Sequence, residues 1–121
     1  MRKPDFTGQW TLNLAASQLS PVIAPVVQGG FAHIEHNEPM VSVHLSVTMD
    51  GTPFDVRFQR ETDWDGDVLE FTDRIPTPNG DMTISFRYEI LDSGRRLRAA
   101  ETLRAPDREQ DNVWIFDRDG R

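Results

Sequence analysis

The sequence of 121 residues predicts an all-β fold, a single eight-stranded antiparallel up-and-down β-barrel over residues 1–121. Apolar and polar residues alternate with a period of two in segments that recur about every ten residues. Turn dipeptides such as Asp50-Gly51 and Asp65-Gly66 separate these segments. No long amphipathic helix is available to cover an open sheet. Closure of the sheet on itself would bury its apolar face and remove its edges.

The first strand is expected to begin in the stretch Phe6-Thr7-Gly8-Gln9-Trp10. Trp10, Leu12 and Leu14 alternate with polar residues, which is the pattern of a strand with one buried face. We expect the large Trp10 side chain to fill one end of the barrel interior.

A long connection is expected at residues 15–30. Pro21 and Pro25 exclude a long helix, and Gly29-Gly30 ends the segment. Two interpretations are open. The segment forms a loop with one helical turn, capped by Ser17, across the barrel mouth, or it wraps apolar side chains over the core.

Seven further strands follow, each bounded by turn residues. They are expected at 31–37, 40–49, 54–62, 68–75, 82–90, 96–104 and 112–118. Each is half apolar and half polar, as in a sheet with one buried and one solvated face. Eight strands enclose an interior that side chains just fill, or that holds one small ligand.

Two charged residues are expected inside the barrel. If Asp65-Gly66 forms a two-residue turn, Arg60 lies opposite Phe71 and Phe58 lies opposite Asp73. This register places the large apolar residues of both strands on one face, and it places Arg60 and Asp73 there as diagonal neighbours.

The next hairpin adds two more polar residues to the interior. If Ile90 faces Leu97, then Tyr88 lies opposite Ala99 and Glu101 shares the inner face. The candidate ligand-binding residues are therefore Arg60, Asp73, Tyr88 and Glu101, with His36 near one end of the barrel.

These polar groups have two interpretations. A charge inside a barrel costs several kcal/mol unless it is paired, so the groups can pair with one another and serve stability. Alternatively, they are the few convergent polar groups of an apolar small-molecule site. Arg60 would then hold a carboxylate through a bidentate contact.

The two ends of the chain resemble a known family. The Gly8-Gln9-Trp10 stretch resembles the Gly-x-Trp start of lipocalins, fatty-acid-binding proteins and related calycins, and the last strand ends at Arg118. In that family such an arginine packs over the first-strand tryptophan. The resemblance, which extends to small bacterial lipocalin-like proteins, implies that Trp10 and Arg118 close one end of the barrel.

Composition excludes several classes of partner. The chain has 13 Lys and Arg residues against 20 Asp and Glu residues, a formal net charge of −7, which argues against a nucleic-acid surface. There are no cysteines, so a disulfide framework and a zinc–thiolate site are excluded. No signal peptide and no membrane-spanning run are visible. The expected location is therefore cytoplasmic, or secreted if a leader has been removed, without insertion into a membrane.

A metal site is not expected. His33 and His44 lie opposite each other in the second hairpin, but that register places them on the outer, solvated face. A metal site needs three or four ligands, and no others are placed beside them.

The favoured function is binding of a small apolar or amphipathic molecule, carboxylate-bearing molecules included, inside the barrel without a cofactor. One alternative is a small barrel enzyme, with Arg60 as substrate anchor and Glu101 and Tyr88 transferring a proton. No residue is assigned as catalytic in the favoured interpretation. Another alternative is a homodimer or larger homo-oligomeric interaction module, which an exposed Trp64 or Trp114 would favour.

Overall fold

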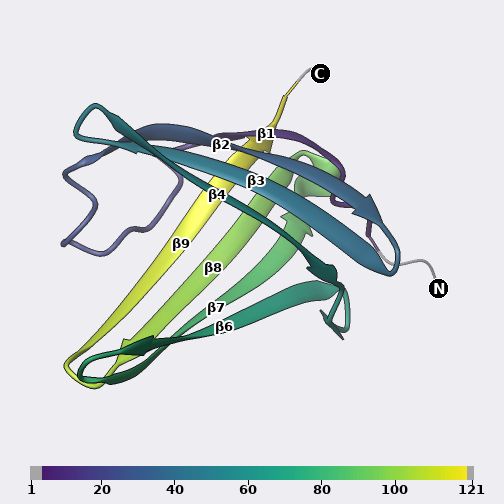
Figure 1. Cartoon of the computed structure of the whole chain (residues 1–121). Coiled ribbons are helices and arrows are strands. Elements are labelled where there is room, and N and C mark those ends of the chain that lie inside the picture. The colour runs from purple at the N-terminus through teal and green to yellow at the C-terminus, as the bar shows by residue number, and fades with distance from the viewer. Residues whose placement is uncertain (1–3, 120–121) are drawn as a thin grey trace.

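The computed structural model describes residues 4–119, which form one antiparallel sheet that curls into a half-barrel (Figure 1). Its nine strands are β1 (Gly8–Leu12), β2 (Val27–Asn37), β3 (Met40–Met49), β4 (Thr52–Glu61), β5 (Trp64–Asp65), β6 (Val68–Thr77), β7 (Gly80–Leu91), β8 (Arg96–Ala105) and β9 (Arg108–Arg118). A 3-10 turn, η1 (Asp92–Gly94), joins β7 to β8. In the described part of the chain, no helix has the length and apolar character needed to cross a membrane.

The predicted fold class is confirmed. The strand order is β4-β3-β2-β1-β9-β8-β7-β6-β5, so every strand except β1 and β9 pairs only with its neighbours in sequence. The alternating inward residues explain the curl, because they give the sheet one continuous apolar face to bury. The prediction had eight strands, and the ninth is the short β5, in which Trp64 pairs with Leu69 and Asp65 with Val68.

The predicted register between β4 and β6 is wrong. The prediction let β4 continue to Thr62 and pair directly with β6, but the backbone pairing of β4 ends at Glu61. The Thr62 N–H donates to the carbonyl of Pro39 at 2.9 Å, which continues the β3–β4 register by one residue instead of pairing with β6. Within residues 4–119, no backbone ladder joins β4 to β6, so the sheet is not a fully closed barrel.

Side chains bridge β4 and β6 in place of a ladder. Arg60 Nη2 lies 3.0 Å from Asp73 Oδ1, and the rings of Phe58 and Phe71 have centroids 5.2 Å apart. In Figure 1 the two halves of the sheet approach each other where β4 runs toward the start of β6 and diverge toward the opposite end. We call these the closed end and the open end of the half-barrel.

The other predicted hairpins are confirmed. Met49 pairs with Thr52 across the Asp50-Gly51 turn. In the β7–β8 hairpin, Tyr88 lies opposite Ala99.

The connection between β1 and β2 contains no full helix. The Ala24 N–H donates to the carbonyl of Ser20 at 2.9 Å in a single helical turn, which begins after Ser17, so Ser17 is not its cap. Gln18 and Val113 exchange backbone hydrogen bonds of 2.8 and 2.7 Å, and Ser17 Oγ accepts the N–H of Ile115 at 2.9 Å. Leu19 and Ile23 pack against the core. The segment therefore runs along β9 and wraps the core, as the second interpretation of its sequence expected.

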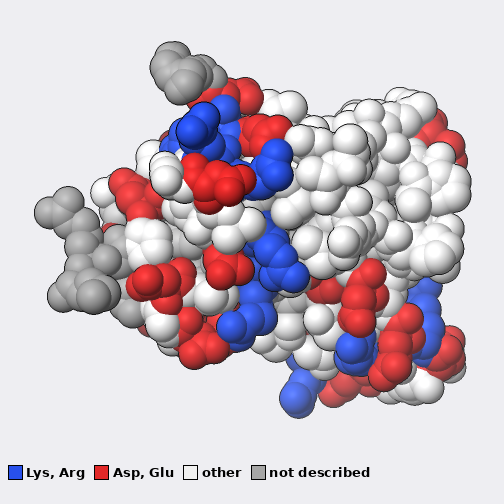
Figure 2. Space-filling view, turned by 180° about the vertical axis from the view of Figure 1, so that it is seen from behind, with Lys and Arg blue, Asp and Glu red and all other residues white. Residues whose placement is uncertain are grey.

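This connection lies in an uncharged part of the surface. The stretch 6–34 contains no Lys, Arg, Asp or Glu, and Val22 is 72% exposed. Figure 2 shows a broad area without charged side chains at the open end, while acidic and basic residues gather over the rest of this view.

Candidate functional site

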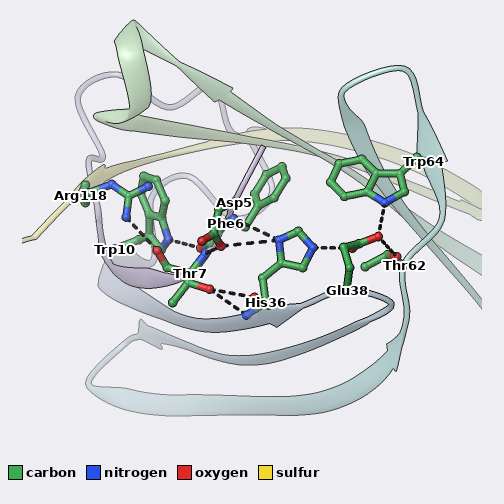
Figure 3. A network of polar contacts seen from close by, with 9 residues as sticks. All are labelled: Asp5, Phe6, Thr7, Trp10, His36, Glu38, Thr62, Trp64 and Arg118. Atoms are coloured by element: carbon green, nitrogen blue, oxygen red, sulfur yellow. Dashed lines mark hydrogen bonds and ion pairs between the residues drawn. The ribbon is translucent and has the colours of Figure 1, made fainter. Parts of the chain in front are cut away.

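The closed end is built on Trp10. This side chain is fully buried, its Nε1 donates to the carbonyl of Phe6 at 3.1 Å, and the Arg118 guanidinium carbon lies 4.2 Å from its ring centroid (Figure 3). Arg118 also donates to the carbonyls of Thr7 at 2.8 Å and Gly94 at 2.7 Å. Arg118 therefore lies over Trp10, as the family resemblance implied, and ties three chain segments together at this end.

A glycine is required two residues before the tryptophan. Gly8 has a φ of +152°, and a Cβ at this position would lie 2.6 Å from Arg118 Nη1. Such a contact is too close for a side chain, so an alanine here would push the arginine off the Trp10 ring.

His36 belongs to the closed end. Its Nδ1 accepts the N–H of Phe6 at 3.2 Å, so Nε2 carries the proton and donates to Glu38 Oε2 at 2.5 Å (Figure 3). Glu38 Oε1 accepts from Trp64 Nε1 and from Thr62 Oγ1, each at 3.0 Å. His36 is one of the predicted ligand-binding residues, but both its ring nitrogens are engaged in this network and it does not line the cleft described below, so the proposed site does not include it.

Stability at acid pH is expected to depend on Glu38. Burial opposes its ionised form, but hydrogen bonds from His36, Trp64 and Thr62 outweigh burial and lower the pKa of Glu38. A carboxyl whose pKa is lowered by folding stabilises the fold above its unfolded pKa of about 4.3, and this stabilisation is lost as the pH falls through the folded pKa.

The test is thermal unfolding across the acid range in Glu38→Gln. The melting temperature of this variant should fall less than that of the wild type between pH about 6 and about 3. Glu35→Gln is the matched control, because Glu35 is an exposed carboxylate on the outer face of β2 whose nearest ion-pair partner is His33 at 3.5 Å. An equal fall in melting temperature between pH about 6 and about 3 in Glu38→Gln and the wild type would contradict the prediction.

The open end contains a cleft of about 380 Å³ between the β3–β4 and β6–β7 hairpins. Its walls are mostly apolar, and three of its side chains, Phe54, Val56 and Ile75, remain 40–52% exposed. The lining residues are Leu45, Val47, Met49, Phe54, Val56, Phe58, Phe71, Asp73, Ile75, Ile84, Phe86, Tyr88, Glu101 and Trp114. Three of the predicted site residues, Asp73, Tyr88 and Glu101, are thus brought together in one cleft.

Arg60 does not line this cleft. Both carboxylate oxygens of Asp73 accept from Arg60 Nη2, at 3.0 and 3.2 Å. The guanidinium carbon lies 4.8 Å from the Phe58 ring centroid and 5.7 Å from that of Phe71. Arg60 Nε is buried without a hydrogen-bond partner among residues 4–119. The guanidinium therefore contacts Asp73 and two aromatic rings. This arrangement agrees with the interpretation in which the inward charges pair with one another and serve stability.

Glu101 is held by two neutral donors. Its Oε1 accepts from Asn112 Nδ2 at 3.0 Å and from Trp114 Nε1 at 2.9 Å. Asn112 is 1% exposed, and its Oδ1 accepts the N–H of Ser20 at 2.7 Å. The Asn112 side chain therefore connects the β1–β2 segment to the carboxylate in the cleft.

Sequence reasoning missed Asn112 and Trp114 as site residues. The signal was present, because the β8–β9 register pairs Glu101 with Asn112 and Ala99 with Trp114. An asparagine that shares the inner face with tryptophan and phenylalanine needs buried hydrogen-bond partners, and a glutamate directly across the ladder provides one.

Tyr88 lies at the inner part of the cleft. It is 3% exposed, and its ring centroid is 5.0 Å from that of Phe71 and 6.0 Å from that of Phe86. Burial, followed by the charge of Glu101, raises the pKa of Tyr88 well above its usual value, while Arg60 acts in the opposite direction. The Tyr88 hydroxyl is thus a neutral group that makes no hydrogen bond within residues 4–119.

The two histidines of the β2–β3 hairpin face outward. His33 and His44 are paired across the ladder, but His33 contacts Gln9 at 2.9 Å while His44 lies 3.4 Å from Asp55. In the described range 4–119, no three His, Asp or Glu side chains are grouped to hold a metal ion.

Comparison with solved structures identifies the fold. No protein-family model matches the chain, and a search of curated proteins found no match. The chain is similar to Ex-FABP, which is described as a siderocalin that functions through dual ligand specificities, with a TM-score of 0.62. The match covers 93% of this chain and 72% of that chain, at 13% sequence identity. The chain has a lipocalin-like fold. At this identity the likeness concerns the fold alone.

The remaining tryptophans face inward in this lipocalin-like fold. Trp64 packs beside Phe6 and His36, with ring centroids 6.0 and 5.6 Å apart, and Trp114 is 8% exposed. The exposed tryptophan that would favour a homo-oligomeric interaction module is therefore not provided by Trp64 or Trp114.

Proposed function

We propose that this protein binds a small apolar or amphipathic molecule in the cleft at the open end. The observation that carries the proposal is the cleft of about 380 Å³, in which Phe54, Val56 and Ile75 leave apolar surface exposed. Concave apolar surfaces with a few polar groups are the usual form of small-molecule sites, which range from about 300 to 1,000 Å³. A ligand would gain about 0.8 kcal/mol for each methylene that it buries there.

Two further points support binding over catalysis. The similar structure, Ex-FABP, is described as functioning through ligand specificities. The enzyme alternative needs Arg60 as a substrate anchor beside Glu101 and Tyr88, but Arg60 is paired with Asp73 and does not line the cleft. Asp73 would have to be displaced before Arg60 could anchor a substrate.

The test is titration of the protein with a neutral apolar fluorescent probe, N-phenyl-naphthylamine. We expect saturable binding, and we expect Val56→Glu to weaken it by about tenfold or more, because the probe would desolvate an unpaired carboxylate. Val56 is half-exposed in the cleft wall, so this change has little effect on folding.

Val22→Glu is the matched control. Val22 is 72% exposed and does not line the cleft, so the same substitution there should leave probe affinity unchanged. Absence of saturable binding to the wild type, or equal affinity in the two variants, would overturn the proposal.

A further inference from the structure

We propose that the cleft selects ligands that carry a protonated amine, with Glu101 as the counter-ion and the Tyr88 hydroxyl as a second acceptor. The inference rests on the proposed function and names the chemical class of the ligand, a lipophilic amine. It replaces the expectation that Arg60 anchors a carboxylate.

Among the described residues, Glu101 has no cationic partner. Its two hydrogen bonds come from Asn112 and Trp114, which are neutral, and both reach the same oxygen, Oε1. Among residues 4–119, Oε2 accepts no hydrogen bond, and no Arg or His forms an ion pair with Glu101. A carboxylate in an apolar cleft is destabilised unless a cation or further donors compensate it, and a ligand ammonium group would supply both.

Arg60, whose partner Asp73 lines the cleft, is already occupied. Arg60 donates to both oxygens of Asp73, so the pair contributes no free cation to the cleft wall. A carboxylate ligand would therefore meet the uncompensated charge of Glu101. An ammonium ligand would meet an attractive charge without breaking the Arg60–Asp73 pair.

Other groups that line the cleft with Glu101 also favour a cation. Tyr88 is almost completely buried, lines the cleft and has a hydroxyl with no hydrogen-bond partner within residues 4–119. A phenol oxygen accepts an ammonium N–H readily. The ring centroid of Tyr88 lies 6.0 Å from that of Phe86, and both rings line the cleft, where aromatic faces attract a cation. The ammonium group would thus lie inside the cleft. The alkyl chain of the ligand would contact the exposed apolar residues at the mouth of the cleft.

The experiment compares three ligands with the same alkyl chain: decylamine, decanol and decanoic acid. Binding to the full chain is measured at neutral pH by calorimetry and by the fluorescence of Trp114 in the cleft wall. We expect the amine to bind about tenfold or more tightly than the alcohol, since charge-assisted hydrogen bonds exceed neutral ones by this margin, and we expect the acid to bind most weakly.

Glu101→Gln tests the assigned counter-ion. The glutamine keeps the shape of the side chain and can still accept from Asn112 and Trp114, so decanol affinity should be retained while the advantage of the amine is lost. Tyr88→Phe should reduce the preference for the amine by a smaller factor. Glu89→Gln is the control for net charge, because Glu89 is half-exposed and its ion-pair partner is Arg98, at 4.0 Å. This variant should keep the wild-type order of affinities.

The outcomes separate this inference from the proposed function. Failure of all three ligands to bind would overturn both. Binding of decanol without a preference for decylamine, a preference that survives in Glu101→Gln, or tighter binding of decanoic acid would overturn the amine inference and leave the binding function in place.

Discussion

Replacing Trp10 by alanine is expected to lower the free energy of unfolding by about 3–5 kcal/mol. The side chain is completely buried, so its removal leaves a large cavity at the closed end. It also removes the hydrogen bond to the Phe6 carbonyl and the aromatic face under the Arg118 guanidinium. Domains of this size are stable by roughly 5–15 kcal/mol, so the loss is a large part of the total.

Urea unfolding followed by circular dichroism measures this effect. Phe54→Ala is the control, because it also deletes an aromatic ring but at a position that is 52% exposed, and we expect it to change stability by about 0.5 kcal/mol or less. Trp10 does not line the cleft, so the folded fraction of Trp10→Ala should keep its affinity for the apolar probe. If Trp10→Ala lowers the free energy of unfolding by less than Phe54→Ala does, the assigned role of Trp10 is wrong.

Replacing Asn112 by leucine is expected to destabilise the fold by about 2–3 kcal/mol. The amide is almost completely inaccessible and makes two hydrogen bonds, one from the Ser20 N–H and one to Glu101 Oε1. Leucine has a similar volume but leaves the Ser20 donor and part of the Glu101 carboxylate unsatisfied. Chemical denaturation measures the loss, and a leucine variant as stable as the wild type would show that these bonds are dispensable.

The Asn112→Asp variant separates hydrogen bonding from packing. Its carboxylate can still accept from Ser20, but its second oxygen would lie where Asn112 Nδ2 now donates to Glu101 at 3.0 Å. Two carboxylates this close cannot both ionise at low cost, so the pKa of one of them is raised in the folded state. A raised pKa means that stability is present at low pH and is lost as the pH rises above the unfolded value of about 4.

The melting temperature of Asn112→Asp relative to the wild type is therefore expected to be lower at pH about 7 than at pH about 4. Asp111→Asn provides a comparison on the same strand, because Asp111 is exposed and forms an ion pair with Arg104 at 2.8 Å. If the difference in melting temperature between Asn112→Asp and the wild type stays constant with pH, residue 112 does not contact Glu101 as described.

The amino-acid sequence by itself determined the fold class, most of the hairpins and the parity of the inward residues. These are local properties: period-two alternation assigns a face to each residue, and two-residue turns such as Asp50-Gly51 set the register of the strands that they join. The prediction for Tyr88 opposite Ala99 was correct for this reason. Parity also brought Asp73, Tyr88 and Glu101 to one side of the sheet.

Only the tertiary structure decided how far the barrel closes and which charges are free. The hydrogen bond from Thr62 to Pro39 follows from the register that the Asp50-Gly51 turn sets for β3 and β4, but no turn sets how far β4 lies from β6. β4 and β6 form no ladder, and the cleft lies between the β3–β4 and β6–β7 hairpins at the open end. Whether Arg60 faces a ligand or Asp73 depends on the distance between two strands that share no turn. The 3.0 Å contact assigns Arg60 to Asp73, and within residues 4–119 no cation pairs with Glu101.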